Sequence, residues 1–178
     1  LHIAFYGILK MGAIHAPVSP MAKGMELSYQ LDDCGARAII CFDQLLPVVR
    51  EIREQTALEQ VFSTSLSELC PAQPPIPVPD LLQAPKLPVT DSIDLMPALA
   101  ATDPAPQNLP RLNLDDTAAL NYTGGTTGLP KGCIHTHGDM LYTCASFVPV
   151  AMGFDEERIG LNFMPEFWIA GENSGLLF

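Results

Sequence analysis

The stretch YTGGTTGLPKG, residues Tyr122 to Gly132, holds four glycines, three threonines, one proline and one lysine within eleven residues. Glycine tolerates positive φ values, so the backbone N–H groups of such a turn can point together into one concavity. The threonine hydroxyls add further donors, and Lys131 adds a positive charge on a long stem. This composition predicts a loop that binds a polyphosphate.

Two common nucleotide-binding loops do not fit this stretch. A P-loop needs glycine directly before its lysine and a hydroxyl residue directly after it, whereas Lys131 follows Pro130 and precedes Gly132. The dinucleotide-binding fingerprint needs a spacing that Gly124, Gly125 and Gly128 do not have. The flanking residues predict a strand on each side, over 117–122 (TAALNY) and 133–136 (CIHT), so the loop joins two strands and does not begin a helix.

Over its full length the stretch resembles the phosphate-loop signature of the adenylate-forming enzymes, the superfamily of acyl-CoA synthetases, luciferases and peptide-synthetase adenylation domains. The residues LHIAFYGILKMGAIHAPVSPMAKGMELSYQLDDCGARAII, 1–40, are similar to the segment that precedes the loop in this superfamily. The resemblance therefore covers about residues 1–40 and 114–178, and it leaves the proline-rich middle of the chain unmatched.

The resemblance implies an enzyme that adenylates a carboxylic acid with ATP and Mg²⁺ and then transfers the acyl group to coenzyme A. The loop would bind the β- and γ-phosphates of ATP, and Lys131 would be the catalytic residue that meets charge developing on the leaving pyrophosphate. The implied phosphate-binding residues are Thr123, Gly124, Gly125, Thr126, Thr127, Gly128 and Lys131. The expected partners are a small-molecule carboxylic acid, ATP and coenzyme A, and the full-length enzyme could form a homodimer.

One loop position departs from the commonest form of the signature, because Gly124 stands where serine is usual. The Thr-Gly-Gly-Thr-Thr-Gly version is similar to the loops of long-chain and medium-chain fatty acyl-CoA synthetases, which favours a fatty acid or a related acid as substrate. An aryl-CoA ligase, a peptide-synthetase adenylation domain and a noncatalytic nucleotide-binding module are the alternatives.

A second candidate segment, MPEFWIAG at 164–171, resembles the superfamily loop beside the acyl pocket. Trp168 replaces the usual histidine, and an indole has neither a titratable base nor a positive charge. No role of that histidine is carried over to Trp168. The resemblance implies that Trp168 and Gly171 belong to the substrate pocket, with ordinary core packing as the alternative for Trp168. We expect Glu166 and Glu172 to be solvated loop charges.

The chain is not expected to provide a metal ligand. His135 and His137 lie two residues apart, but no cysteine or carboxylate stands near them at the spacing of a zinc site. The superfamily segments that support Mg²⁺, ribose and adenine would lie beyond Phe178, so this chain looks like a piece of a longer protein that would be inactive alone.

Helix and strand patterns alternate through the first third of the chain, which predicts an α/β fold with mostly parallel strands. Expected helices cover 1–11, 24–33, 44–55 and 139–148, with a short one near 92–101, and expected strands cover 13–18, 37–42, 61–64 and 158–164 in addition to the two beside the loop. The segment 71–110 carries 11 of the 17 prolines and predicts an irregular surface excursion. We interpret the chain as part of one N-terminal AMP-binding domain, with an α/β layer at 1–66, the proline-rich excursion at 67–112, and the loop and acyl segment at 113–178.

The charge, the cysteines and the apolar segments of the chain limit its expected partners and its expected location in the cell. The formal net charge of −11 opposes docking on nucleic acid or an anionic membrane. Five scattered cysteines without a C-x-x-C pair indicate reduced, buried thiols and a cytoplasmic protein. The longest apolar segment, 1–18, is interrupted by His2, Lys10 and His15, so no transmembrane segment is expected.

Overall fold

The computed structural model describes residues 1–105, 108–124, 128–146 and 161–177 of the 178-residue chain. The chain forms two compact units, one of Leu1–Ser19 with Pro106–Phe178 and one of Pro20–Ala105. We refer to them as the loop unit and the sheet unit and describe each by itself. No helix in the described part of the chain combines the length and the apolar character needed to cross a membrane.

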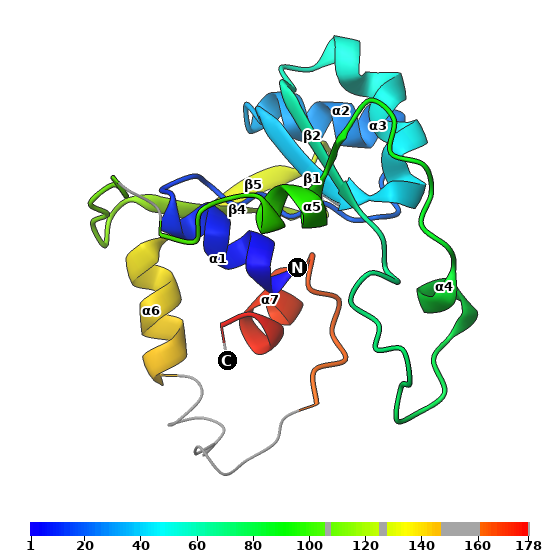
Figure 1. The fold of residues 1–178 in the computed structure, drawn as a ribbon. Coiled ribbons are helices and arrows are strands. Elements are labelled where there is room, and N and C mark those ends of the chain that lie inside the picture. Colours follow the sequence, from blue (N-terminus) through cyan, green and yellow to red (C-terminus); the bar gives the residue numbers. More distant parts are fainter. Residues whose placement is uncertain (106–107, 125–127, 147–160, 178) are drawn as a thin grey trace. The chain divides into compact units, whose positions relative to one another are not determined.

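The sheet unit contains a parallel sheet in the order β1-β2-β3, formed by Ala38–Phe42, Gln60–Thr64 and Ile93–Asp94. β1 and β2 pair in parallel with Ile39 opposite Val61. α2 (Gly24–Asp33) and α3 (Leu46–Ile52) lie together on one side of these strands (Figure 1). The buried side chains of this unit include Leu27, Leu31, Leu46, Val49, Ile52, Leu58 and Val61. The expected alternation of helices with parallel strands is therefore confirmed.

The helix expected over 44–55 is divided into three consecutive pieces. A 3₁₀ turn, η1 (Asp43–Leu45), leads into α3, and a second, η2 (Arg53–Gln55), follows it. Pro47 occupies the first turn of α3, where its missing N–H removes no helical hydrogen bond. By contrast, α2 has the bounds expected from the sequence, and Gly35 follows it with φ +63°, a conformation that glycine adopts at low cost.

The proline-rich segment contributes regular structure to the sheet unit. It contains α4 (Asp80–Gln83), strand β3, and α5 (Leu95–Ala100), which is the short helix expected near 92–101. Strand β3 was not expected, because two residues are too few to show an alternating pattern. It pairs with β2 in parallel, with Phe62 opposite Ile93.

The loop unit contains α1 (His2–Lys10), the antiparallel strands β4 (Thr117–Thr123) and β5 (Lys131–Thr136), α6 (His137–Ser146) and α7 (Ile169–Gly175). Figure 1 shows α1 and α7 close together near the chain termini. The core of the unit consists of Phe5, Ala118, Ala119, Met140 and Leu176. β4 and β5 pair on either side of the glycine loop, so the expected loop between two strands is confirmed.

The strand expected over 13–18 is reduced to one isolated parallel bridge, between His15 and Ala119. The amide of His15 donates to the carbonyl of Ala118 at 2.9 Å, and the amide of Leu120 donates to the carbonyl of His15 at 2.8 Å. Pro17 has no amide proton with which a ladder could continue. A single bridge is therefore enough to place His15 against β4.

Two further expectations change in the C-terminal part of the chain. α6 begins at His137, earlier than expected, because Thr136 and Asp139 form a reciprocal cap: the Thr136 amide donates to Asp139 Oδ2 at 2.8 Å and the Asp139 amide to Thr136 Oγ1 at 3.1 Å. Of the strand expected over 158–164, residues 158–160 lie outside the described residues and 161–164 are not in a strand. There the side chain of Asn162 accepts the amide proton of Met164 at 3.1 Å, a local bond that competes with strand pairing.

Candidate functional site

The two strands beside the glycine loop set its ends. In the antiparallel register, Thr123 lies opposite Lys131 and Tyr122 opposite Gly132. The hydroxyl of Thr123 donates to the carbonyl of Lys131 at 3.4 Å. Lys131 is therefore the first residue of β5, and only residues 124–130 connect the strands. Of the expected phosphate-binding residues, Gly125, Thr126 and Thr127 lie outside the described residues.

The described loop glycines differ in what surrounds them. A Cβ added at Gly132 would lie 3.2 Å from the ring of Tyr122, so glycine at this position lets the ring cover the neighbouring strand. Among the described residues, nothing lies within 4 Å of a Cβ built at Gly124 or Gly128. Packing thus accounts for Gly132, and it does not account for Gly124 or Gly128.

Lys131 has the exposure that phosphate binding requires. It is exposed at the start of β5, and its ammonium group makes no hydrogen bond or ion pair to the described part of the chain. The β4–β5 hydrogen bonds fix the backbone of Lys131, so its ammonium group can approach an anion from a defined position. The described geometry is therefore compatible with the phosphate contact expected of Lys131.

The acyl segment folds back onto α7. The amide of Trp168 donates to the carbonyl of Pro165 at 3.1 Å, and the Trp168 indole packs edge-on against Phe167 with ring centroids 5.3 Å apart. Trp168 is 53% exposed, so ordinary core packing does not describe it in this chain. Gly171 is buried, and a Cβ there would overlap the carbonyl group of Pro165. Close packing thus requires glycine at 171, while Trp168 remains accessible.

Glu172 is not the solvated loop charge expected from the sequence, since its exposed fraction is 0%. Its Oε2 accepts a hydrogen bond from Nδ2 of Asn121 at 2.9 Å and lies 3.5 Å from Nδ1 of His15. Asn121 and His15 are also buried, with 6% and 7% exposed. Three elements of the loop unit, β4, α7 and the segment after α1, therefore meet at one polar cluster.

Sequence reasoning missed this cluster, although part of its signal was present. Leu176, the residue that ends α7, lies four positions after Glu172, which places Glu172 on the same helix face as a residue of the core. Asn121 shares the inward face of β4 with Ala119, two residues earlier. The contact between the two residues could not be expected from the local pattern, because 51 positions separate them in the chain.

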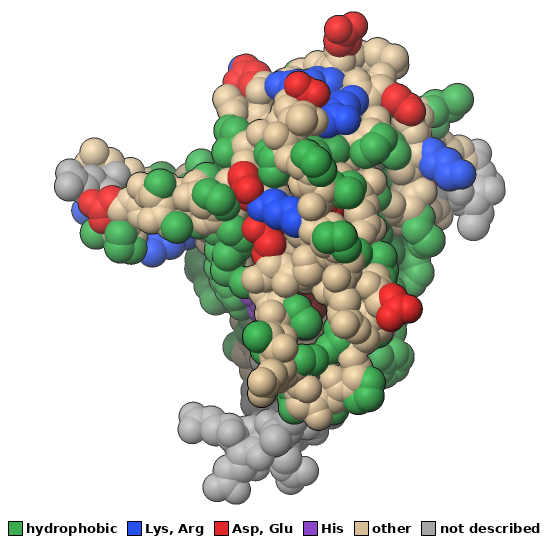
Figure 2. Space-filling view, turned by 45° about the vertical axis from the view of Figure 1, so that its right-hand side comes forward, with side chains coloured by type: hydrophobic (Ala, Val, Ile, Leu, Met, Phe, Trp, Pro, Cys, Tyr) green, Lys and Arg blue, Asp and Glu red, His purple; other side chains and the backbone are tan. Residues whose placement is uncertain are grey.

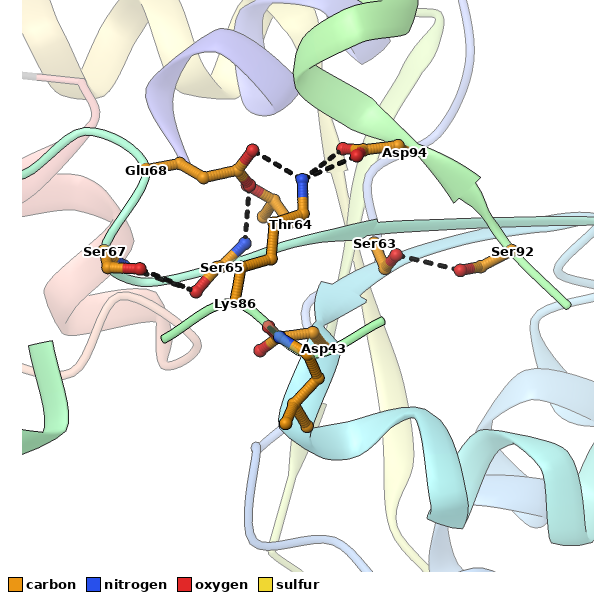
Figure 3. Close-up of polar contacts among 10 residues, drawn as sticks. Asp43, Ser63, Thr64, Ser65, Ser67, Glu68, Lys86, Ser92 and Asp94 are labelled. Carbon is orange, nitrogen blue, oxygen red and sulfur yellow. Dashed lines mark hydrogen bonds and ion pairs between the residues drawn. The ribbon is translucent and has the colours of Figure 1, made fainter. Parts of the chain in front are cut away.

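The sheet unit carries another polar cluster, around Lys86 (Figure 3). Its ammonium group donates to Glu68 Oε1 at 2.6 Å and to both carboxylate oxygens of Asp94, at 2.7 and 2.6 Å. The hydrogen bond to Asp94, followed by that to Glu68, raises the pKa of Lys86. Burial would raise the pKa of Glu68, but hydrogen bonds from Lys86, the Ser65 amide and Thr64 outweigh it and hold that pKa below its usual value.

This cluster holds the proline-rich segment to the sheet. All three protons of the Lys86 ammonium group are used within the cluster, which leaves none for a ligand. The amide of the next residue, Leu87, donates to the buried Asp43 at 2.9 Å, and Ser92 shares a hydrogen bond with Ser63 at 2.8 Å. We assign this cluster a structural role.

A metal site and a broad anion-binding surface each require suitable side chains to gather in one place. The described residues contain no group of three or more histidine, cysteine or acidic side chains that could hold a metal ion. On the face drawn in Figure 2, basic side chains lie beside acidic ones and form no continuous basic surface. On this face, anion binding would depend on local contacts rather than on a broad positive field.

The cysteines are free, as expected, but they are not all buried. Cys133 is exposed in β5, and the other four are half-buried. The next residue of β5, Ile134, is exposed as well, so neither face of the strand is buried at this point. Burial, with a smaller contribution from Asp43, raises the pKa of the Cys41 thiol to about 11.

A protein-family model and several curated proteins match this chain. The family model described as AMP-binding enzyme matches residues 1–178. A long-chain-fatty-acid–CoA ligase of Salmonella typhimurium is 32% identical over 144 residues, which are 78% of this chain and 26% of that protein. A long-chain-fatty-acid–CoA ligase of Bacillus subtilis is 30% identical over 178 residues, covering 95% of this chain and 31% of that protein.

A solved structure shows the same architecture. The crystal structure of the anthranilate CoA ligase AuaEII in complex with anthranoyl-AMP aligns with a TM-score of 0.66 and 26% identity, over 83% of this chain and 24% of that one. The chain thus spans about a quarter to a third of the length of the curated relatives described above.

Proposed function

Because the chain belongs to the AMP-binding enzyme family, we propose that it is part of the N-terminal domain of an acyl-CoA synthetase. The full-length enzyme would join a carboxylic acid to ATP, forming an acyl-adenylate and pyrophosphate, and would then transfer the acyl group to the thiol of coenzyme A. The observation that carries this proposal is the eleven-residue Gly/Thr stretch, residues 122–132, which ends β4, forms the loop and begins β5 at Lys131.

The first chemical step needs little activation of the nucleophile. A substrate carboxylate oxygen attacks the α-phosphorus of ATP, the bond from that phosphorus to the pyrophosphate oxygen breaks, and the electron pair leaves with pyrophosphate. The negatively charged reactants repel each other, so positioning and charge neutralisation provide most of the rate enhancement.

The loop residues supply those two effects in our proposal. Backbone N–H groups and threonine hydroxyls from Thr123 to Gly128 would hold the β- and γ-phosphates. Gly124 and Gly128 have no packing reason to be glycine among the described residues, which supports a role in close backbone approach to phosphate. Lys131 would stabilise the charge that develops on the leaving pyrophosphate.

Mg²⁺ accompanies ATP in this chemistry and would neutralise phosphate charge. The described residues hold no cluster of carboxylates or histidines that fits such an ion. We therefore assign no Mg²⁺ ligand to this chain and derive no step from one.

A fatty acid is the acyl substrate that we propose. Gly124 in the third loop position and the 30–32% identity to two long-chain-fatty-acid–CoA ligases support this choice. The 26% identity to an anthranilate CoA ligase favours an aryl acid as the second candidate. We also propose that the full-length enzyme is cytoplasmic and dimeric, which cell fractionation and light scattering would test.

Pyrophosphate exchange by the full-length enzyme tests the adenylation step. Lys131→Ala should lower acyl-adenylate formation by at least tenfold, because one preorganised donor to developing charge typically contributes about 3 kcal/mol to the barrier. The variant should unfold as the wild type does, since the Lys131 ammonium group has no partner among the described residues. Lys10→Ala, which removes an exposed lysine of α1, is the matched control and should retain full exchange.

The outcomes separate the possibilities clearly. Wild-type exchange in Lys131→Ala would contradict the role of Lys131. Pyrophosphate release by the wild-type enzyme across a panel of fatty and aryl acids would identify the substrate class. A wild-type enzyme that releases none with any acid would refute the proposed function.

A further inference from the structure

We infer that Glu172 is a positioning residue that fixes helix α7, and with it the Trp168 segment, to the strand that leads into the phosphate loop. The hydrogen bond from Asn121 Nδ2 to Glu172 Oε2, 2.9 Å long, is the link. The inference rests on the proposed function, because it assigns the two linked stretches to the acyl and phosphate sides of one active site.

The burial of Glu172 is unusual for its chemistry. Glutamate is almost never completely buried unless it is paired, because a carboxylate loses its hydration inside a protein. Here the carboxylate has Asn121 and His15 as polar neighbours, while the His15 ring packs edge-on against Phe5, with centroids 5.0 Å apart. The cluster is therefore enclosed by the core of the loop unit, where an apolar side chain would pack without such a desolvation cost.

The position of Glu172 in α7 connects its side chain to the acyl segment. The amide of Glu172 donates to the carbonyl of Trp168 at 2.8 Å, so the anchored residue lies one helical turn after the tryptophan. α7 has seven residues, Ile169–Gly175, too few to hold a stable position without tertiary contacts. Its other described side-chain contacts with the rest of the chain lie at its C-terminal end. There Ser174 Oγ donates to Asn162 Oδ1 at 3.0 Å, His2 Nε2 approaches the carbonyl of Gly175 at 2.9 Å, and Tyr6 donates to the carbonyl of Leu176. Glu172, in the middle of α7, is thus the side-chain anchor nearest to Trp168.

The two ends of the link differ in how firmly they are held. Asn121 lies in β4, where it pairs with Cys133 in the ladder, and the neighbouring Leu120 bonds to His15. These backbone contacts do not depend on the Glu172 side chain. Loss of the link should therefore displace α7 and Trp168 more than it displaces β4 and the loop.

This asymmetry gives a test with separate acyl and nucleotide readouts. In the full-length enzyme, Glu172→Ala should raise the KM for the carboxylic acid at least tenfold and change the KM for ATP less than threefold. Glu172→Gln should restore most of the acyl KM, because its side-chain oxygen can still accept from Asn121 and its amide can donate to an acceptor that is unsatisfied among the described atoms, Asn121 Oδ1. Asn121→Ala should reproduce the acyl KM increase, and the double variant should be no worse than either single one.

A purely structural role would give a different result. It would reduce kcat in proportion to the folded fraction, measured as the burst of acyl-adenylate, and would leave both KM values unchanged. Equal increases in both KM values, or a wild-type acyl KM in Glu172→Ala, would also overturn the inference. If Glu172→Ala fails to fold, Asn121→Ala decides the question by the same split.

A readout without turnover separates this inference from the proposed function. Glu172→Ala should speed amide hydrogen exchange in peptides from α7 at least fivefold and change that of β4 peptides less than twofold. Unchanged α7 exchange would overturn the inference even in an active enzyme. A wild-type enzyme without adenylation activity would refute the proposed function, and with it the assignment of the linked stretches.

Discussion

Gly171 offers the sharpest test of the packing between the acyl segment and α7. In Gly171→Ala, the new Cβ would overlap the carbonyl group of Pro165 and lie 2.9 Å from the amide nitrogen of Glu166. These obstructing atoms belong to the backbone and cannot rotate away, so the 165–168 loop must shift relative to α7. Overpacking of this kind costs about 2–3 kcal/mol, towards the upper end of the usual range.

The gain in helix propensity offsets part of that cost. Alanine is favoured over glycine in a helix by about 1 kcal/mol, which leaves a net local loss of about 1–2 kcal/mol. Gly7→Ala is the matched control, because Gly7 lies inside α1 and nothing described lies within 4 Å of its Cβ position. That variant should gain about 0.5–1 kcal/mol of helix stability.

Amide hydrogen exchange by mass spectrometry measures both effects locally in the full-length protein. Peptides from α7 should exchange roughly 5- to 30-fold faster in Gly171→Ala, while α1 peptides should exchange about two- to fivefold more slowly in Gly7→Ala. Unchanged α7 exchange in Gly171→Ala would refute the steric reasoning. If α7 exchange were unchanged in Gly171→Ala but the acyl-chain preference of the enzyme changed, Gly171 would be shown to line the substrate pocket rather than to permit close packing.

Three further predictions concern separate features. Trp168→Ala should shift the acyl-length profile of the full-length enzyme, and an unchanged profile would count against a role in the acyl pocket. Lys86→Met should lower the free energy of unfolding, measured in urea, by about 1–3 kcal/mol, because two carboxylates lose their shared partner. The control, Arg37→Met, breaks an ion pair whose two side chains are more than half exposed and should cost less than about 1 kcal/mol. Equal losses in the two variants would contradict the structural role of Lys86. At pH 8 iodoacetamide should alkylate Cys41, with its pKa of about 11, about a hundredfold more slowly than an unperturbed thiol of pKa about 8.5. Its rate should rise about tenfold per pH unit towards pH 11 as the thiolate forms, and peptide mapping that shows Cys41 reacting as fast as the exposed Cys133 would contradict this.

The sequence by itself determined the features that depend on neighbouring residues. α2 has the expected bounds because an amphipathic period and a glycine at the αL position, Gly35, act within a few residues of each other. The strands on both sides of the Gly/Thr loop could be predicted for the same reason, since apolar strand residues end where the glycines and Pro130 begin. The match of the loop to the AMP-binding family also follows from contiguous residues.

Only the tertiary structure decided the features that depend on residues far apart in the chain. Strand β3 exists because β2 provides a pairing edge, and His15 is placed by one bridge to β4 although Pro17 prevents a longer strand. Glu172 follows an apolar run and looks like a loop charge, yet Asn121, 51 residues earlier, allows it to be buried. A local pattern shows which residues can form an element, but whether a polar side chain is solvated or paired depends on which distant partner the folded chain brings to it.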